Sequence, residues 1–429
     1  MKYNIQKTLL HFSLLCILLA GCNTQTRNDK EKGTSSISAD AKSEQILEME
    51  HKALASRAEI TKIKIDPNSK NPTVFALNDL VGSIEYIPLE TKDECVIGSI
   101  NDRRNFKISD NFILVQCSKT GRFFLFNRKG GFIAQIGDIG EGPGEYLRTA
   151  NSYFIDEENK QIILFAIQPD RYLYYDMTGK YVKSVQSENK DISERTGGTY
   201  ESFFHEGLLL MIPNLGDVPY SYTILDNNLN TVAQHVKPLQ FPKNPNFTVA
   251  IRPPFSYYVY GNKMHVRNNN LNDTLYFFEN SQKIIPKYTI NAGIYEVTTD
   301  LLYDQNFFSK TFLNIMSAFE TKDHLFIDYR FKNKTYYCYF DKNKKDIFHF
   351  SSEAGIQNDF DGGLDFWPQQ QYNDVLYSFY DAYLFQENAE KSNDFQPKGP
   401  QGAIDNLKEF SHKIDAEDNP VLVIAKLKK

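Results

Sequence analysis

The chain beyond about residue 60 consists of short apolar segments that alternate with polar turns. Continuous or alternating apolar runs recur at close spacing, among them NFILVQC, RFFLFN, QIILFAI, RYLYYD, TYYCYF and the final VLVIAKLK. Such runs, with turn residues between them, predict many short strands and therefore an all-β sandwich, barrel or propeller. We expect two short helices among the strands, at 301–319 and 375–387.

Self-similarity within this pattern favours the propeller. The segments 111–137 and 161–186 share one plan: an apolar strand, a polar turn, an aromatic strand, a Lys/Gly turn and a third strand. Looser copies of this plan follow. The six units start at Phe112, Ile162, Leu208, Met264, Leu325 and Leu376, so successive starts are 50, 46, 56, 61 and 51 residues apart. Propeller blades repeat every ~40 to 50 residues, so we predict a six-bladed β-propeller with loop insertions. The last strand, VLVIAKLKK, is expected to pair with SIEYIPLE near the domain start and close the ring.

The N-terminal segment has a different pattern. Lys2 and Lys7 lie before an apolar run at 8–20, which is too short to span a bilayer. Gly21 and Cys22 follow this run. This is the plan of a bacterial lipoprotein signal peptide, so we predict that residues 1–21 are removed and that a lipid on Cys22 makes the membrane a partner. The polar segment 22–59 is interpreted as a flexible tether with a short helix, which is either a spacer or packed on the domain. The propeller domain is expected at 60–429.

Composition and charge narrow the class of function. Aromatic residues make up 14% of the chain, in keeping with strands. The net charge is -6, and removal of the signal peptide takes it to -8, because its two lysines leave. An acidic chain with no basic run is not expected to bind nucleic acid, whose phosphates require clustered Lys and Arg. The three cysteines after Cys22, which are Cys95, Cys117 and Cys338, lack zinc-site spacing and are interpreted as buried strand residues.

The glycine-rich stretch GDIGEGPGEY, at 137–146, is tested first as a phosphate-binding loop. A P-loop requires a Lys and a Ser or Thr after its glycines, and a dinucleotide fingerprint requires a helix. Here Pro143 interrupts the glycines, Glu141 and Glu145 would repel phosphate, and a strand follows. We therefore expect no nucleotide partner and interpret the stretch as a turn at the crossover from one blade to the next.

A second stretch, NDFDGGLDFWP at 358–368, carries alternating acids around two glycines. Calcium takes six to eight oxygen ligands, so Asp359, Asp361 and Asp365 are weak calcium candidates. The spacing is not that of an EF-hand, and a loop anchored by its aromatic residues is the favoured interpretation. Trp367 is either a core residue or a platform for a ligand, and core packing is favoured. No other cofactor is expected.

The segment 242–261 is the most aromatic loop of the chain. Arg252, Phe255, Tyr257 and Tyr258 would offer a guanidinium and aromatic faces to a carbohydrate or peptide, while two prolines stiffen the backbone. Strand propensity in SYYVYG supports the alternative that these tyrosines are buried blade residues. We favour burial and keep the four residues as candidates for ligand binding.

Local catalytic motifs do not occur in the sequence. The eight histidines are dispersed without an H-x-H or H-E-x-x-H pair, and no G-x-S-x-G elbow is present. Catalytic residues are therefore unknown. An enzyme assembled from different blades at a channel mouth stays open, because carboxylates far apart in sequence meet there.

Several of these segments together resemble the NHL-like six-bladed β-propeller lipoproteins of Gram-negative bacteria. The resemblance extends over about 60–429 and rests on SIEYIPLET, GEGPGEY with the following YFIDEENKQIILF, RYLYYDMTGKYVKSV, NDFDGGLDFWP and DNPVLVIAKLK. NHL repeats place Gly-Pro-Gly before each blade, and the later blades here lack it. The resemblance implies the fold and a location in the cell envelope, since the function of that family is largely unassigned.

Two functions from different classes are consistent with these features. The first is a lipid-anchored binding or scaffold module at the outer membrane, facing the periplasm or the outside, with a glycan, peptide or envelope protein as partner. The second is a propeller-type lyase or glycoside hydrolase with its site in the central channel. An enzyme should gather Asp, Glu, His and Tyr from three or more blades with strongly perturbed pKa values in one deep pocket, whereas a binding module should show a shallow face rich in aromatic residues.

Overall fold

Strands make up most of the described residues in the computed structural model of the chain, and the predicted all-β class is confirmed. The structure describes residues 60–69, 72–100, 102–167, 171–186, 200–213, 220–226, 230–236, 256–267, 274–297, 311–351, 354–391 and 396–429. All of them belong to one compact unit of the chain, 53–429. The predicted signal peptide and tether, with Cys22, lie outside the described residues.

Most described strands form antiparallel groups of four. The first group contains β4 (Phe106–Ile108), β5 (Phe112–Gln116), β6 (Phe123–Asn127) and β7 (Phe132–Ile136). The second contains β10 (Arg148–Asp156), β11 (Gln161–Ile167), β12 (Arg171–Asp176) and β13 (Tyr181–Gln186). The third contains β14 (Tyr200–His205), β15 (Leu208–Pro213), β16 (Tyr220–Leu225) and β17 (Thr231–Val236).

Three further groups follow in the second half of the chain. The fourth contains β18 (Ser256–Tyr260), β19 (Lys263–Arg267), β20 (Thr274–Asn280) and β21 (Lys283–Asn291). The fifth contains β22 (Asn314–Glu320), β23 (His324–Phe331), β24 (Lys334–Asp341) and β25 (Asp346–Phe350). The sixth contains β26 (Gln370–Tyr372), β27 (Val375–Tyr380), β28 (Val421–Leu427) and the early strand β3 (Val81–Pro88).

Each unit predicted from the sequence starts in the second strand of one of these groups. Second strands are buried along most of their length, so they appear as apolar runs, as QIILFAI does in β11. Several first strands are short or polar, such as FKI in β4 and QQY in β26. The predicted repeat spacing is therefore confirmed, and each unit gains one strand before its predicted start.

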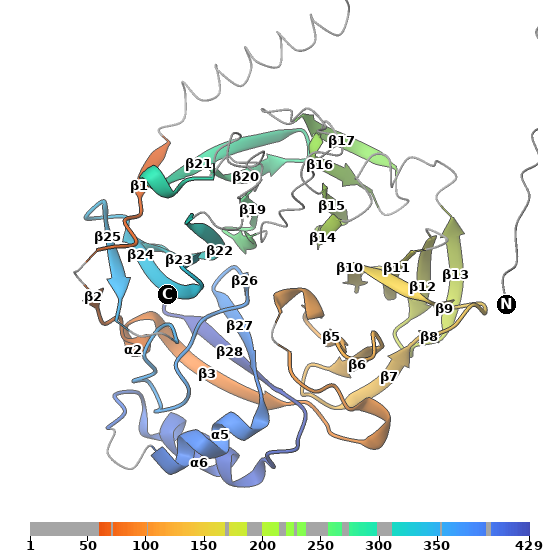
Figure 1. Cartoon of the computed structure of the whole chain (residues 1–429). Helices are drawn as coiled ribbons and strands as arrows, with labels where there is room; N and C mark the ends of the chain where they lie inside the picture. The colour runs from red at the N-terminus through yellow and green to blue at the C-terminus, as the bar shows by residue number, and fades with distance from the viewer. Residues whose placement is uncertain are drawn as a thin grey trace, which may run out of the picture. The chain divides into compact units, whose positions relative to one another are not determined.

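The first strands of neighbouring groups contact one another. β4 contacts β10, β10 contacts β14, and β18 contacts both β22 and β26. A single parallel bridge between Val259 and Tyr372 joins the fourth and sixth groups into one nine-stranded sheet. Figure 1 shows β10, β14, β22 and β26 on the inner side of their groups, with β13, β17, β21 and β25 on the outer side. Side chains from the first strands of several groups can therefore meet.

The segment that precedes the first group pairs with three later groups in succession. β1 (Thr61–Lys64) runs parallel to β21, and β2 (Pro72–Thr73) runs parallel to β25. β3 then pairs antiparallel with β28, with Tyr86 opposite Val423. The predicted pairing of SIEYIPLE with the last strand is confirmed, and β1 and β2 are additions that the sequence did not predict. These pairings cover strand edges that would otherwise be open.

The GDIGEGPGEY stretch lies between β7 and β10, as the crossover prediction requires. Within it β8 (Asp138–Ile139) pairs in parallel with β9 (Glu145–Tyr146). Gly144 has a φ of +77°, its carbonyl oxygen accepts the Tyr175 hydroxyl at 2.8 Å, and a Cβ there would lie 2.7 Å from the Tyr181 ring. Glycine is needed at this position for the backbone conformation and for the close approach of two tyrosines.

Helices are few in the described ranges: α2 (Leu77–Leu80), α5 (Ala382–Lys391), α6 (Gln401–Lys413) and the 3₁₀ turns η1 (Asp93–Cys95), η2 (Arg103–Asn105) and η3 (Gly293–Tyr295). The helix predicted at 375–387 is wrong in its first half, because residues 375–380 pair with β28 as a strand. In the helix predicted at 301–319, residues 314–319 belong to β22, and 301–310 lie outside the described residues.

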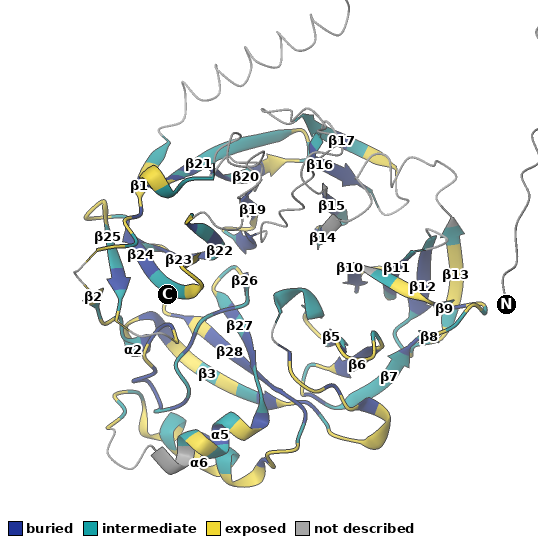
Figure 2. Cartoon of the chain, in the orientation of Figure 1, coloured by how far each residue is buried: buried dark blue, intermediate teal, exposed yellow. Residues whose placement is uncertain are grey.

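The two longer helices, α5 and α6, pack beside the sixth group. Buried residues also line the strands. Phe385 of α5 meets Phe410 of α6 at a ring distance of 5.3 Å, and Phe410 stacks on Tyr86 of β3 at 5.4 Å. Figure 2 shows buried residues along the middle strands. The three cysteines Cys95, Cys117 and Cys338 are free, and they are buried as predicted. The prediction that they are strand residues holds only for Cys338 in β24, because Cys95 ends η1 and Cys117 follows β5. Among the described helices, none is long and apolar enough to cross a membrane.

Candidate functional site

The predicted ligand-binding residues separate in the structure. Arg252 and Phe255 lie outside the described residues. Tyr257 and Tyr258 are consecutive in β18, so their side chains point to opposite faces of the strand. Both are buried, as the favoured interpretation expected, but each belongs to a different polar cluster.

Tyr257 lies against two cations from the first group. The Lys107 ammonium of β4 is 5.6 Å from the centre of the Tyr257 ring and donates to its hydroxyl at 3.2 Å. The Arg103 guanidinium of η2 is 5.7 Å from the same ring centre. Lys107 also lies 5.4 Å from the ring centre of Tyr153, in β10. We call these four residues the central cationic site; they come from the first, second and fourth groups.

The backbone around Arg103 is fixed from two sides. Asp102 caps η2, because its carboxylate accepts the backbone N–H of Arg104 at 2.9 Å and pairs with the Arg104 guanidinium at 2.5 Å. Burial would raise the pKa of Asp102, but Arg104 outweighs burial and holds the pKa below its ordinary value. From β26, the Gln370 amide donates to the carbonyls of Arg103 and Phe106 at 2.8 and 2.9 Å. The two cations are thus carried on a short, well-anchored segment.

The aromatic partners hold Lys107 without neutralising it. Tyr153 is fully buried and donates to the carbonyl of Arg104 at 2.5 Å, and burial raises its pKa. A ring face attracts a cation through its quadrupole but leaves the positive charge in place. In the described part of the chain Lys107, which is half-buried, has no carboxylate within ion-pair distance. Lys107 therefore keeps its positive charge, whereas the charge of Arg103 acts to lower the pKa values of Asp102 and Asp328.

Trp367 lies in a packed cluster next to this site. Its indole donates to Asp328 at 3.3 Å and to Ser317 at 3.4 Å, and the Tyr337 ring packs against it at 4.7 Å. Burial raises the pKa of Asp328, with partial offset by Ser317 and by the charge of Arg103. Arg103 reaches this cluster directly, since its guanidinium donates to the carbonyl of Met316 at 3.1 Å. These contacts agree with the interpretation of Trp367 as a packing residue.

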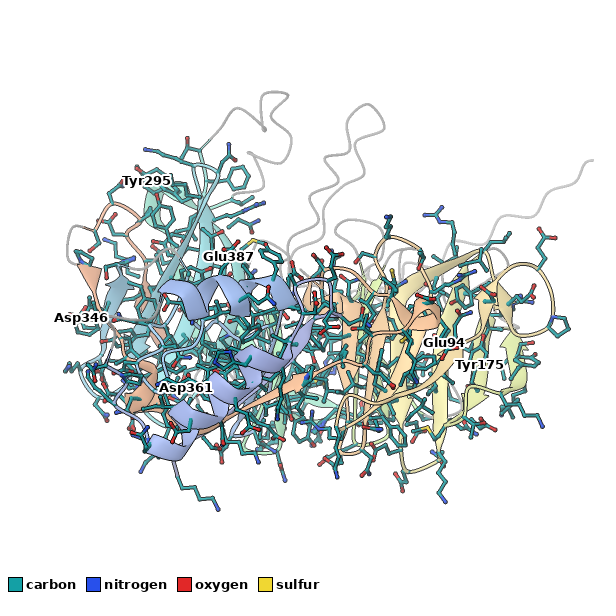
Figure 3. All side chains as sticks on the ribbon, turned by 90° about the horizontal axis from the view of Figure 1, so that it is seen from below. Glu94, Tyr175, Tyr295, Asp346, Asp361 and Glu387 are labelled. Carbon is teal, nitrogen blue, oxygen red and sulfur yellow. The ribbon has the colours of Figure 1, made fainter. Side chains whose placement is uncertain are left out.

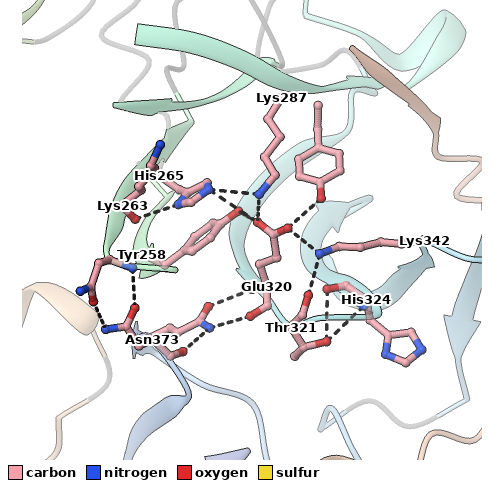
Figure 4. Close-up of polar contacts among 12 residues, drawn as sticks. Tyr258, Lys263, His265, Lys287, Glu320, Thr321, His324, Lys342 and Asn373 are labelled. Atoms are coloured by element: carbon pink, nitrogen blue, oxygen red, sulfur yellow. Dashed lines mark hydrogen bonds and ion pairs between the residues drawn. The ribbon is translucent and has the colours of Figure 1, made fainter. Parts of the chain in front are cut away.

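Tyr258 faces a different group, which we call the Glu320 cluster: Tyr258, His265, Lys287, Tyr288, Glu320 and Lys342. Glu320 ends β22 and is fully buried. One carboxylate oxygen accepts from Tyr288 at 2.8 Å and Lys342 at 2.5 Å. The other accepts from Tyr258 at 3.0 Å and Lys287 at 2.9 Å. Figure 4 shows these donors converging on the carboxylate from the fourth and fifth groups.

His265 completes the Glu320 cluster. Its ring stacks on Tyr258 at 4.8 Å, and the Nδ1 hydrogen is assigned toward the carbonyl of Lys263 at 2.9 Å, which leaves Nε2 to accept from Lys287 at 3.2 Å. Burial, and then the charge of Lys287, lower the pKa of His265 to about 4. Burial would raise the pKa of Glu320, but the two lysines outweigh it, and the pKa lies below its ordinary value. The donors at the Glu320 carboxylate come from both the fourth and the fifth group. The cluster therefore joins two sheets.

The predicted calcium candidates Asp359, Asp361 and Asp365 each have protein partners. Asn358 donates to two of them, to Asp361 at 2.9 Å and to Asp365 at 3.2 Å. Asp359 accepts the backbone N–H of Asn78 at 2.8 Å and pairs with Lys398 at 3.1 Å. Asp361 accepts the Tyr86 hydroxyl at 2.9 Å, and burial raises its pKa. Figure 3 shows Asp361 on the side of the unit where α5 and α6 lie. Among the described residues, no group of three His, Cys, Asp or Glu could hold a metal, and calcium stays a prediction.

A cavity of about 1060 Å³ adjoins η2 in the first group. It lies between the segment 93–105 and the turn that joins β5 to β6. Its charged lining residues include Asp93, Glu94, Asp102, Arg104, Lys119 and Arg122. Arg122 is paired with Asp138 at 3.0 Å, as Arg104 is with Asp102, so the cavity presents both signs of charge.

Little in the sequence indicates the residues that the structure brings together here. Arg103 and Lys107 lie 154 and 150 positions before Tyr257, in a stretch without a motif. The one available signal was local: three basic residues fall within 103–107, directly before a strand. Such short basic stretches are usually solvated, so the signal becomes informative only once the strand is placed beside β10 and β18.

Comparisons with known proteins define the family. The profile of a domain of unknown function, DUF4934, matches residues 60–426, so the chain belongs to that family. A solved structure of a Bacteroides fragilis NCTC 9343 protein, named only as exported, is 19% identical with a TM-score of 0.60, covering 86% of this chain and 100% of that one. A DUF4221 member from Bacteroides vulgatus ATCC 8482 is 11% identical with a TM-score of 0.42, covering 81% and 97%. No curated protein matches the chain.

These results refine the predicted resemblance. The matching family is defined by DUF4934 and carries no NHL designation. The Bacteroides fragilis protein shares the fold over its whole length, and at this identity the likeness concerns the fold alone. The NHL-like relationship stays a prediction.

Proposed function

We propose that the chain is a lipid-anchored, six-bladed β-propeller of the cell envelope that binds a ligand at the central cationic site. The propeller interpretation is supported by the six four-stranded groups, by contacts between their first strands and by the pairing of β3 with β28. The NHL-like resemblance of the sequence agrees with it.

The envelope location is supported by two observations. The N-terminal sequence has the charge, apolar run and LAGC ending of a lipoprotein signal, which places the lipid on Cys22. A protein that shares the fold is named as exported. An anchor at the outer membrane, through the polar tether 22–59, would hold the propeller close to envelope glycans, peptides and proteins.

One observation carries the binding function: two cations and two tyrosines from three strand groups converge where the first strands meet. Arg103 and Lys107 are held against Tyr257 at 5.7 and 5.6 Å from its ring centre. Ligand sites in proteins commonly combine aromatic side chains with a few polar groups that fix the orientation of the ligand. The cationic and aromatic side chains suit recognition of a ligand.

Binding is favoured over catalysis by how the ionisable groups are distributed. The buried Glu and His lie in the Glu320 cluster, where protein donors already saturate the carboxylate. The central cationic site contributes Arg, Lys and Tyr. The enzyme alternative would require such groups from three or more blades in one pocket, whereas the side chains of the Glu320 cluster come from two groups and its carboxylate is fully buried.

A binding screen tests this proposal. The purified chain is assayed against panels of glycans, peptides and envelope proteins, with analysis of products in the same samples. We expect a ligand that is retained unchanged and is lost in Arg103→Ala and Lys107→Ala. The matched controls Arg330→Ala and Lys129→Ala remove exposed cations in other turns and strands and should leave binding intact. Conversion of a bound glycan would instead establish the enzyme alternative, and the absence of any ligand would contradict the proposal.

A further inference from the structure

The cavity beside η2 is a second place where the chain can hold a ligand. We propose that this cavity binds a short zwitterionic peptide, whose amino group faces Asp93 and Glu94 and whose carboxylate faces Lys119. The site is separate from the central cationic site, because neither Lys107 nor Tyr257 is among the residues that line the cavity. The proposal therefore adds a binding activity to the proposed function and does not depend on it.

The cavity has room for a ligand of several residues. Its volume is about 1060 Å³, at the upper end of the roughly 300 to 1,000 Å³ that small-ligand sites usually enclose. One wall is the segment that contains η1 and η2, and the other is the turn between β5 and β6. Phe106 at the start of β4 pairs with Val115 near the end of β5, so both walls lie at the same end of the first group. Exposed residues of both walls, such as Val96 and Lys119, leave the cavity open to solution.

Three charged residues of the lining already have partners within the protein. Arg104 pairs with Asp102 at 2.5 Å, and Arg122 pairs with Asp138, outside the lining, at 3.0 Å. Each pair compensates its own charge, and a charged ligand would have to compete with the existing partner. These pairs therefore belong to the wall of the cavity, and the groups that select a charged ligand are the remaining ones.

The remaining charges have opposite sign on the two walls. Asp93 and Glu94 lie in η1, and neither makes an ion pair with another described residue. Lys119 lies in the turn between β5 and β6, and no carboxylate in the described part of the chain is within ion-pair distance of it. A ligand that carries both an ammonium and a carboxylate gains an attraction at each wall, whereas a ligand of one sign gains it at only one.

The uncharged lining residues suit a peptide better than a sugar. Asn105, Ser118 and Thr120 carry amide and hydroxyl groups that both donate and accept hydrogen bonds, as the backbone of a peptide requires. Val96 is 56% exposed and can pack against an aliphatic side chain of the ligand. Phe124 is the one aromatic residue among the described residues of the lining, and it is only 3% exposed. The cavity therefore offers no open ring face on which a sugar could stack.

Calorimetry on the full chain with capped and uncapped peptides tests the proposal. The probes are tetra-alanine with free termini, the same peptide with an acetylated N-terminus, the same peptide with an amidated C-terminus, and a neutral galactose oligosaccharide. We expect the free peptide to bind, with affinity that falls as salt rises. Each capped peptide, and the neutral oligosaccharide, should bind about fivefold more weakly or worse, which is the effect of losing one partly exposed ion pair.

Substitutions assign each end of the peptide to one wall. Lys119→Ala should weaken binding of the free peptide about fivefold and leave the amidated peptide unchanged, because that peptide has no carboxylate. The double substitution Asp93→Asn and Glu94→Gln should weaken the free peptide and leave the acetylated peptide unchanged. The matched controls Lys129→Ala and Glu158→Gln remove exposed charges in turns outside the cavity and should leave binding of every peptide intact.

Other outcomes overturn the proposal and leave the proposed function to its own test. Equal binding of free and capped peptides, or tighter binding of the neutral oligosaccharide, would show that the charges of the two walls do not select the ligand. If no peptide binds, the second site fails, whatever the ligand of the central cationic site proves to be. Loss of peptide binding in Lys107→Ala but not in Lys119→Ala would move the peptide to the central cationic site. Thermal unfolding of each variant distinguishes a change at the site from a loss of the fold.

Discussion

Tyr257 and Tyr258 are neighbours in β18, yet they enter clusters with different polar partners. Tyr258 donates to Glu320, whose carboxylate also receives two lysines and a second tyrosine. Tyr257 accepts from Lys107 and lies against Arg103, and Lys107 meets no described carboxylate. A saturated carboxylate with protein donors on every side serves structure, because an added ligand would have to displace a donor. An ammonium held by rings, as Lys107 is, is positioned and still charged, which suits recognition.

The comparison predicts that the Glu320 cluster contributes strongly to the free energy of unfolding. Glu320→Ala leaves Lys287 and Lys342 beside a buried space and removes the acceptor of two tyrosines, so we expect a loss of about 3 to 5 kcal/mol in the free energy of unfolding. Urea unfolding measures it. Glu320→Gln, which keeps the shape and one acceptor, should lose less. A loss below about 1 kcal/mol for Glu320→Ala would contradict the structural role.

The same cluster predicts how stability depends on pH. The pKa of His265 is lowered to about 4 from 6.5, and the pKa of Glu320 also lies below its ordinary value. The folded state therefore binds fewer protons than the unfolded chain, and stability falls as the pH drops below about 6.5. We expect His265 to account for about 3 kcal/mol at most between pH 7 and pH 4. Urea midpoints over this range should fall less steeply in His265→Gln; identical slopes would exclude the residue.

The two tyrosines allow a matched pair of substitutions. Tyr258→Phe removes a hydrogen bond to a buried carboxylate and should cost about 1.5 to 3 kcal/mol of unfolding free energy. Tyr257→Phe keeps the ring that holds both cations and removes only an acceptor of half-buried Lys107, so it should cost less than about 1 kcal/mol. Equal costs in chemical denaturation would remove the distinction between the clusters.

The smallest effect on stability is expected at Lys107 itself. Lys107→Ala removes cation–π contacts to Tyr153 and Tyr257, which contribute about 0.5 to 1 kcal/mol at such a site. The free energy of unfolding should therefore change by no more than that, while ligand affinity changes strongly. A loss comparable to that of Glu320→Ala would show that Lys107 is structural.

Much of the fold could be predicted from the sequence, because buried middle strands carry their own signal. The runs in β5, β11 and β15 are apolar along most of their length, and their spacing reported the repeat. The strands β4 and β26 have only three residues each, and β26 is polar, so nothing local distinguished them. The edge strands β1 and β2 depend on partners more than 200 positions away, which no local pattern reports.

The candidate site was predictable only in part, for a related reason. Tyr257 was identified from its aromatic surroundings, whereas Arg103 and Lys107 gain their role from the contact of β4 with other first strands. Helix 375–387 was misassigned because VLYSFY is followed without a break by the residues of α5. Pairing with β28 makes residues 375–380 a strand, and that partner lies some 40 positions further along the chain.

A crystal structure of the chain with the ligand that the binding screen finds to depend on Lys107 tests the central claim most directly. The account predicts that this ligand lies within hydrogen-bonding distance of Lys107 Nζ, beside the Tyr257 ring, with the Glu320 cluster unchanged. Finding this ligand only in the cavity beside Lys119 and Arg122, or in place of a donor of the Glu320 cluster, would contradict it.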